Sequence, residues 1–152
     1  IKVQEDLTAC LIEGSSLVFK FYYEAEIEGT LPANGRIVTA INIADIVGAL
    51  TMKGLALPRL IDKDSYDIYA ISGFCGGNPD KASENYVNLV KKAKLTAKER
   101  GIIQFSMSRI SQAFRSIDSY GIFAGSRFIG TNINSDVYLR VSTFLKNVSS
   151  VR

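Results

Sequence analysis

Few side chains in this chain of 152 residues could do chemistry, and histidine is absent. Without histidine, the chain cannot form a His-based catalytic triad, a His general acid or base, or a His-ligated metal site. The two cysteines, Cys10 and Cys75, lie far apart and lack CxxC spacing. This usage indicates neither a disulfide framework nor a zinc site, and a reduced, intracellular chain is the simpler interpretation.

Carboxylate pairs and a glycine cluster are the remaining candidates for catalysis or phosphate binding. Acidic residues recur at short spacing as Glu24 with Glu26, Asp62 with Asp64, and Asp64 with Asp67. Glycosidase-type chemistry needs two acids held across a cleft, one with a raised pKa, and no pair here shows that pattern. The glycines of SGFCGGNP match neither GxGxxG nor P-loop spacing. We therefore predict no enzyme activity, no cofactor and no metal site.

A basic run is the stronger candidate for a binding site. Five cations fall within ten residues, at Lys91, Lys92, Lys94, Lys98 and Arg100. Such a run can follow a phosphate backbone or an anionic lipid surface, with binding that weakens as salt rises. An ordinary solvated face is an equally good interpretation, because charge runs are common on protein surfaces. The net charge of +3 is compatible with an acidic partner without requiring one.

The element expected to organise the chain is a strand over residues 17–28, LVFKFYYEAEIE. Apolar and polar side chains alternate there almost strictly, as in an antiparallel strand with one buried and one wet face. Glu24, Glu26 and Glu28 fall on the wet face. We predict that these carboxylates are solvated or, in a self-associating protein, that they meet the lysines of a neighbouring copy.

Periodicity predicts a mixture of helices and strands after this strand. Turn-forming residues indicate a loop at 29–35. Apolar residues at helical spacing then indicate a helix from Thr39, its N-cap, to Met52, closed by Gly54. Residues 86–101 are ambiguous. The other predicted elements are a strand at 65–74, an exposed loop at 75–85, a strand at 102–110, a helix at 111–120 and a C-terminal β-hairpin.

These elements predict one α+β domain over residues 1–152, with an antiparallel sheet packed against two or three helices. The length and the hydrophobic content of 47% suit a single folded core. No apolar run is long enough to span a membrane. Because the chain starts at Ile1 rather than Met, we expect a flexible N-terminal arm upstream of it.

The order of these segments resembles that of rhabdovirus matrix proteins. The resemblance covers most of the chain and is carried by FKFYYEAEIE, LPANGR, TAINIADIVGAL with Met52–Gly54, SYDIYAISGFCGGNPD, YVNLVKKAK and GIIQFSMSRI. Its most specific part is AFRSIDSYGIFAGSRFIG followed by VYLRVSTFLK. This part looks like the short helix, glycine turn and final aromatic strand of that family. A divergent member, such as one from a plant-infecting virus, fits the distance best.

The resemblance implies a structural protein that self-associates, condenses the nucleocapsid and links it to the envelope membrane. The implied partners are other copies of the chain, the viral nucleoprotein–RNA complex, anionic membrane lipids and the envelope glycoprotein. The implied location is the virion beneath the envelope, with the host cytoplasm, membranes and nucleus. The family's lysine-rich N-terminal arm and proline-rich budding motif have no match in this sequence.

The resemblance also assigns surfaces to two segments. The basic run from Lys91 would face nucleocapsid or membrane. A flexible loop for membrane contact or self-association would comprise Gly76, Gly77, Asn78, Pro79, Asp80 and Lys81.

Two other functions stay open. One is a ligand-binding module in which the sheet and the Thr39 helix enclose an apolar pocket of roughly several hundred Å³. The other is an enzyme that uses Glu24 or Cys75, which the sequence supports least.

Overall fold

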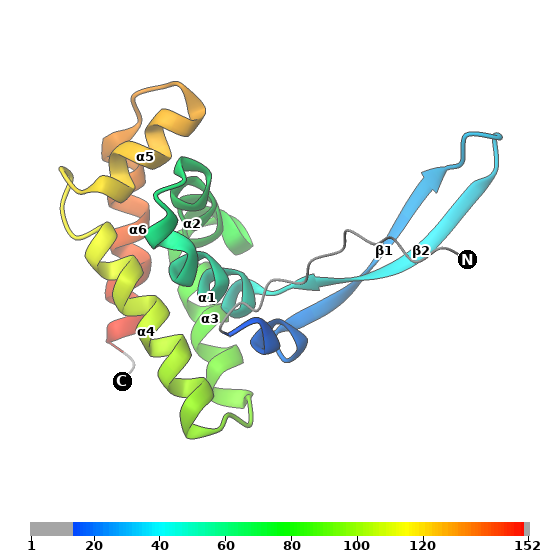
Figure 1. Ribbon diagram of the computed structural model, residues 1–152, viewed down its shortest axis with the longest axis horizontal. Coiled ribbons are helices and arrows are strands. Elements are labelled where there is room, and N and C mark those ends of the chain that lie inside the picture. Colours follow the sequence, from blue (N-terminus) through cyan, green and yellow to red (C-terminus); the bar gives the residue numbers. More distant parts are fainter. Residues whose placement is uncertain (1–13, 151–152) are drawn as a thin grey trace, which may run out of the picture.

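The computed structural model describes residues 14–150, which form six α-helices and one two-stranded antiparallel sheet. The helices pack into one body, and the sheet is a hairpin that projects from that body (Figure 1). The elements in chain order are η1 (Ser15–Phe19), β1 (Tyr22–Thr30), β2 (Arg36–Ala44), α1 (Ile46–Ala56), η2 (Leu57–Arg59), α2 (Asp62–Phe74), η3 (Cys75–Gly77), α3 (Pro79–Lys92), α4 (Ala97–Ala113), α5 (Tyr120–Ile129) and α6 (Asn134–Ser149), where η marks a 3₁₀ turn.

Helix α2 lies at the centre of the body, where it contacts α1, α3, α5 and α6. Around it, α1 packs on α4, and α3 packs on α6. Each α-helix places at least one buried apolar side chain in the shared core, with examples at Leu50, Ile68, Ala82, Ile110, Ile122 and Phe144. Removal of this apolar surface from water is the main force that holds the helices together.

Helices α1 and α4 approach so closely that a side chain cannot fit between them at Gly54. A Cβ at that position would overlap the hydroxyl of Ser106 and would lie 2.7 Å from its carbonyl oxygen. The same hydroxyl donates a hydrogen bond of 2.8 Å to the carbonyl oxygen of Thr51. The prediction that Gly54 closes a helix is wrong. Gly54 lies inside α1, where it allows the close contact with α4.

The predicted α+β fold, with a sheet covered by helices, is wrong. The strand predicted at 65–74 is helix α2, and the strand predicted at 102–110 lies within α4. The buried positions of α2 include Ser65, Ile68, Tyr69 and Ser72, which recur at helical spacing. Two of these buried residues are serines. The apolar residues alone therefore did not show the helical period, and their alternation falsely indicated a strand.

The predicted C-terminal hairpin is also wrong, because helices α5 and α6 occupy that part of the chain. Val137, Val141 and Phe144 of α6 are fully buried at spacings of four and three, which is the period of a helix. The helix predicted at 111–120 does not form either. Helix α4 extends to Ala113, and the residues from there to α5 form a connection.

The N-terminal half of the prediction is correct in part. Strand β1 exists but begins at Tyr22, and β2 occupies the segment predicted to start a helix, so Thr39 lies in the middle of a strand. The N-cap of α1 is Asp45, whose carboxylate accepts hydrogen bonds from the backbone N–H groups of Val47 (2.8 Å) and Gly48 (3.0 Å). The β-branched residues of RIVTAINIA explain the strand, because such side chains favour an extended chain.

Candidate functional site, the projecting hairpin

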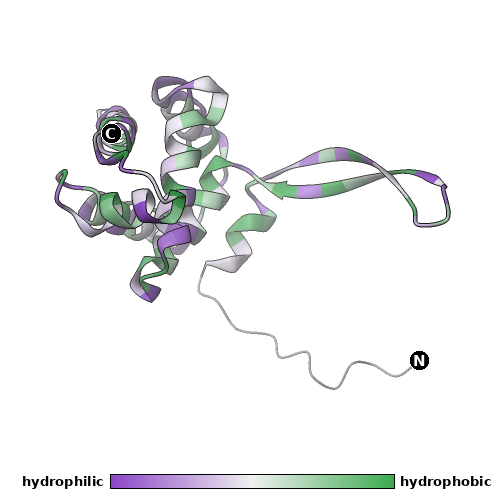
Figure 2. Cartoon of the chain, turned by 90° about the horizontal axis from the view of Figure 1, so that it is seen from above, coloured by the Kyte–Doolittle hydropathy of each residue, from purple (hydrophilic) through white to green (hydrophobic). Residues whose placement is uncertain are grey.

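The hairpin of β1 and β2 is the feature that distinguishes this molecule from a plain helical bundle. Its strands pair with Tyr22 opposite Ala44 and Thr30 opposite Arg36. The turn falls within the predicted loop at 29–35, and the N–H of Leu31 donates to the carbonyl oxygen of Gly35 (2.7 Å). Strands of nine residues place the turn roughly 30 Å from the body. Beyond their base, where η1 lies, no helix is drawn beside the strands in either view (Figures 1 and 2).

One side of the hairpin is apolar and open to solvent. Residues directly opposite each other in an antiparallel pair point to the same side, so the register defines an apolar face made of Tyr23, Ala25, Ile27, Ile37, Thr39, Ile41 and Ile43. On this face Tyr23 is 54% exposed, Ile27 45%, Ile37 42% and Ile41 38%. The described part of the chain does not cover it.

The other side of the hairpin carries the three glutamates predicted to lie on the wet face of the strand. Glu24, Glu26 and Glu28 are exposed and point to the same side of β1. Glu28 forms an ion pair with Arg36, with 2.5 Å between Oε1 and Nε. Within residues 14–150, Glu24 and Glu26 form no ion pair, so their carboxylates are solvated.

The base of the hairpin is anchored in the helical body. Phe21, which precedes β1, is buried, and its carbonyl oxygen accepts a hydrogen bond of 2.9 Å from the N–H of Asp45. A Cβ on Gly48 would lie 2.6 Å from that carbonyl oxygen, so glycine permits the close approach. Burial raises the pKa of Asp45, although the hydrogen bonds that its carboxylate accepts from Gly48 and Val47 act to lower it. These contacts join the first residues of the hairpin to helix α1.

The structure brings the five predicted cations together at one end of the body. Lys91 and Lys92 end α3, Lys94 lies in the connection, and Lys98 and Arg100 lie in the first turn of α4. We call these five residues the basic tip. All are exposed, and none forms an ion pair with a described carboxylate. The nearby Glu99 is instead paired with Lys20 (2.6 Å), so the positive charge of the tip is not neutralised within residues 14–150.

The predicted flexible loop is mostly helical. Only residues 75–78 connect α2 to α3, and Pro79, Asp80 and Lys81 form the first turn of α3. Asn78 caps this helix, because its side-chain oxygen accepts a hydrogen bond from the N–H of Lys81 (2.9 Å). Gly76 and Gly77 have positive φ angles of 72° and 105°, which suit a tight connection. The pair Asn78–Pro79 is the signal in the sequence from which this helix start could have been predicted.

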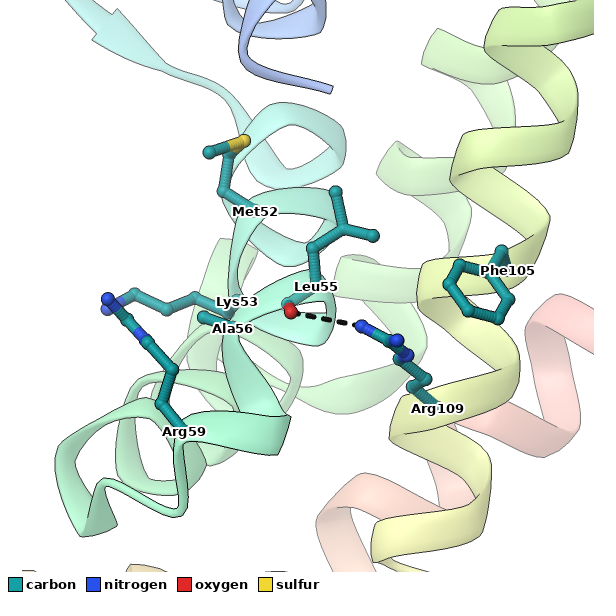
Figure 3. A pocket seen from close by; sticks show the side chains of 7 residues that line it. All are labelled: Met52, Lys53, Leu55, Ala56, Arg59, Phe105 and Arg109. Carbon is teal, nitrogen blue, oxygen red and sulfur yellow. Dashed lines mark hydrogen bonds between the residues drawn. The ribbon is translucent and has the colours of Figure 1, made fainter. Parts of the chain in front are cut away.

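A groove that the sequence did not predict lies between α1 and α4 (Figure 3). Its volume is about 330 Å³, and it is lined by Met52, Lys53, Leu55, Ala56, Arg59, Phe105 and Arg109. Arg109 crosses it, donating a hydrogen bond of 3.1 Å to the carbonyl oxygen of Leu55 and lying 4.3 Å from the centre of the Phe105 ring. The predicted ligand pocket between a sheet and a Thr39 helix has no counterpart within residues 14–150, because the helix there begins only at Ile46 and the sheet stands away from the body.

The aspartates considered for catalysis are held by cations. The Arg127 guanidinium binds Asp62 at 2.5 and 2.6 Å and lowers the pKa of this carboxyl group. Burial acts to raise the pKa of Asp64, but Lys53 and Arg59 outweigh burial and lower it. A carboxyl group with a lowered pKa is poorly suited to act as a general acid near neutral pH. No group of three or more potential acidic, histidine or cysteine ligands is placed to hold a metal within residues 14–150.

No helix in the described part of the chain is long and apolar enough to cross a membrane. Comparisons with protein-family models, with the curated proteins and with the solved structures found no match to this chain.

Proposed function

We propose that this chain is a structural protein that self-associates, with the hairpin of one copy bound to another copy. The observation that carries the proposal is the exposed apolar face of the hairpin. A two-stranded hairpin by itself is at best marginally stable in water, and a sheet with one apolar face is normally covered on that face. A second copy supplies the cover without any other partner.

The backbone of the hairpin supports the same function. A two-stranded sheet has two outer edges, and each edge presents unpaired N–H and C=O groups to solvent. Every copy of the chain carries the same face and the same edges, so one contact made by two copies can be symmetric and self-complementary. The uncharged stretch of β2 from Ile37 to Ala44 adds no electrostatic repulsion to such a contact.

Self-association is the part of the predicted matrix-protein function that the hairpin supports. The resemblance to rhabdovirus matrix proteins included strands at 65–74, at 102–110 and near the C-terminus, and these segments are helices. Nucleocapsid condensation, membrane linkage, glycoprotein binding and a place in the virion depend on that resemblance, and they stay predictions. The basic tip is the surface on which we would test nucleocapsid or lipid binding.

The proposal predicts that polar substitutions on the apolar face weaken self-association. The variant with Ile27→Thr and Ile41→Thr keeps β-branched residues but removes apolar area from that face. We expect its association constant to fall at least tenfold, because about 1.4 kcal/mol of lost binding free energy gives that factor. Sedimentation velocity and light scattering over a range of concentrations measure the change.

A matched control has the same kind of change on the opposite face of the hairpin. The variant with Val38→Thr and Ala40→Thr should associate like the unchanged chain. Circular dichroism should show the same helix content in all three proteins. An unchanged chain that remains monomeric up to its solubility limit would overturn the proposal, as would equal association of the two variants.

A further inference from the structure

The two edges of the hairpin differ in charge and composition. Strand β1 carries Glu24, Glu26 and Glu28, followed by Gly29. Strand β2 has no charged residue from Ile37 to Ala44, and five of these eight residues are β-branched. Charged side chains protect an edge strand against pairing with another chain, whereas a long apolar edge strand is a template for it. The composition therefore selects β2 as the edge open to another strand.

The hydrogen-bond pattern shows which backbone groups of β2 have no partner within residues 14–150. At the base of the hairpin the N–H of Asp45 donates to Phe21, and at the turn the N–H of Leu31 donates to Gly35. In an antiparallel ladder every second opposed pair exchanges hydrogen bonds, and the pairs between them point their N–H and C=O groups outward. With the observed register, the outward-facing residues of β2 are Arg36, Val38, Ala40, Asn42 and Ala44.

We propose that β2 of one copy pairs antiparallel with β2 of a second copy, so that two hairpins form one four-stranded sheet across a two-fold axis. This inference rests on the proposed function and adds an edge contact to the covering of the apolar face, because edge pairing alone leaves the apolar faces of both copies open on one side of the sheet. Pairing centred on Ala40 uses every outward-facing backbone group of β2. It also keeps the apolar faces of the two copies on the same side of the sheet, whereas a shift by one residue would place an apolar face beside an acidic face.

Repulsion between glutamates favours pairing through β2 over pairing through β1. In the four-stranded sheet the two β1 strands lie at the outer edges, three strand spacings apart, which is roughly 14 Å. That separation exceeds the Debye length of about 8 Å at physiological salt, so the glutamates of the two copies are largely screened from each other. Pairing through β1 would instead bring their side chains to about 5 Å, where like charges destabilise a sheet.

Disulfide cross-linking tests which edge is used. In a background with Cys10→Ser and Cys75→Ser, one new cysteine is introduced by Ala40→Cys or, as the matched control, by Glu26→Cys. Residues 26 and 40 lie directly opposite each other in the hairpin, at the same distance from the turn but on different edges. Opposed residues in a hydrogen-bonded pair are about 5.5 Å apart between Cα atoms, within disulfide range. We expect covalent dimers from Ala40→Cys and at least tenfold fewer from Glu26→Cys.

A proline substitution tests the backbone contact directly. Ala40→Pro removes an outward-facing N–H group and leaves the hydrogen bonds between β1 and β2 in place, because proline is tolerated at a free edge. We expect it to weaken association at least tenfold. Ala40→Thr, which retains the N–H group, should associate like the unchanged chain. Sedimentation velocity measures both effects.

The outcomes separate this inference from the proposed function. If the unchanged chain associates but Ala40→Cys gives no dimer and Ala40→Pro has no effect, the β2 contact is wrong and self-association stands. Dimers from Glu26→Cys alone would move the contact to β1 and also overturn the inference. If the unchanged chain is monomeric at all concentrations, both proposals fail.

Discussion

Asp64 shows how a single carboxylate is kept charged inside the helical body. Its side chain is only 3% exposed, and its oxygens accept hydrogen bonds from Lys53 (2.9 Å) and Arg59 (2.8 Å). Burial acts to raise its pKa, yet the bonds and charges of these two cations hold the pKa below the ordinary value of 3.8. The folded state therefore binds the proton less tightly than the unfolded state, and the ionised carboxylate stabilises the fold at neutral pH.

Asp64→Asn should lower the free energy of unfolding by about 1–3 kcal/mol at pH 7, because the charged hydrogen bonds to Lys53 and Arg59 are lost. The unchanged chain loses the same contribution as pH falls below 3.8 and through the lower folded-state pKa. The difference between the two proteins should therefore shrink in acid. Urea unfolding at neutral and acidic pH measures it, with Asp118→Asn, an exposed change in the connection after α4, as the control. A difference that does not depend on pH would contradict the argument.

At the scale of elements, helix α4 begins with a capping box that is visible in the sequence. The Thr96 hydroxyl accepts from the N–H of Glu99 (3.2 Å), and the Glu99 carboxylate accepts from the N–H of Thr96 (2.8 Å). The hydrogen bond from Lys20, followed by those from Thr96, lowers the pKa of Glu99 to about 2. The spacing of threonine and glutamate in TAKE indicates a helix start. The prediction missed it because the alternation in the next residues was interpreted as a strand.

Two glycines inside helices should respond in opposite ways to alanine. Alanine favours a helix over glycine by up to about 1 kcal/mol, and a Cβ on Gly101 would meet no atom within 4 Å, so Gly101→Ala should stabilise the protein. Gly54→Ala would push α1 away from Ser106 on α4, at a net cost of about 1–3 kcal/mol. Thermal and urea unfolding measure both. Similar stabilisation by the two variants would show that α1 and α4 are not closely packed.

At the scale of the whole molecule, the hairpin and the helical body differ in what protects their hydrogen bonds. The helices surround a common core that contains residues with no exposed surface, such as Leu50 and Ile68. Among the residues that the structure describes, the hairpin has only its own ladder, with exposed side chains on both faces. Local opening is easiest where few buried contacts hold a segment, so a free copy should open its hairpin long before its body.

Hydrogen exchange should therefore report the state of association. In dilute solution, amides of the hairpin should exchange at least tenfold faster than amides of α2. On association, the outward-facing amides of Val38, Ala40 and Asn42 should become protected, while the outward-facing amide of Glu26 stays fast. Exchange measured by NMR at low and high concentration checks this. Equal protection of Glu26 and Ala40 would contradict pairing through β2.

The sequence by itself determined features that depend on neighbouring residues. The absence of histidine excluded a whole class of chemistry. The alternation over residues 17–28 predicted a strand with an acidic face, which is correct from Tyr22 onward. The turn chemistry of LPANG correctly predicted the loop, in which Asn34 has a φ of 63°. The five cations of the basic tip lie close together in space because they lie within ten consecutive residues.

Only the tertiary structure decided where helices replaced the predicted strands. Alternation over a few residues cannot identify a strand when four other helices surround a helix, as they surround α2 and bury its serines. The same holds for Phe21, whose place in the alternation suggested a sheet face but whose side chain is buried in the helical body. Burial depends on partners far along the chain, which local patterns do not contain. The sequence showed that one face of the hairpin is apolar, but only the tertiary structure shows that the helical body leaves this face uncovered.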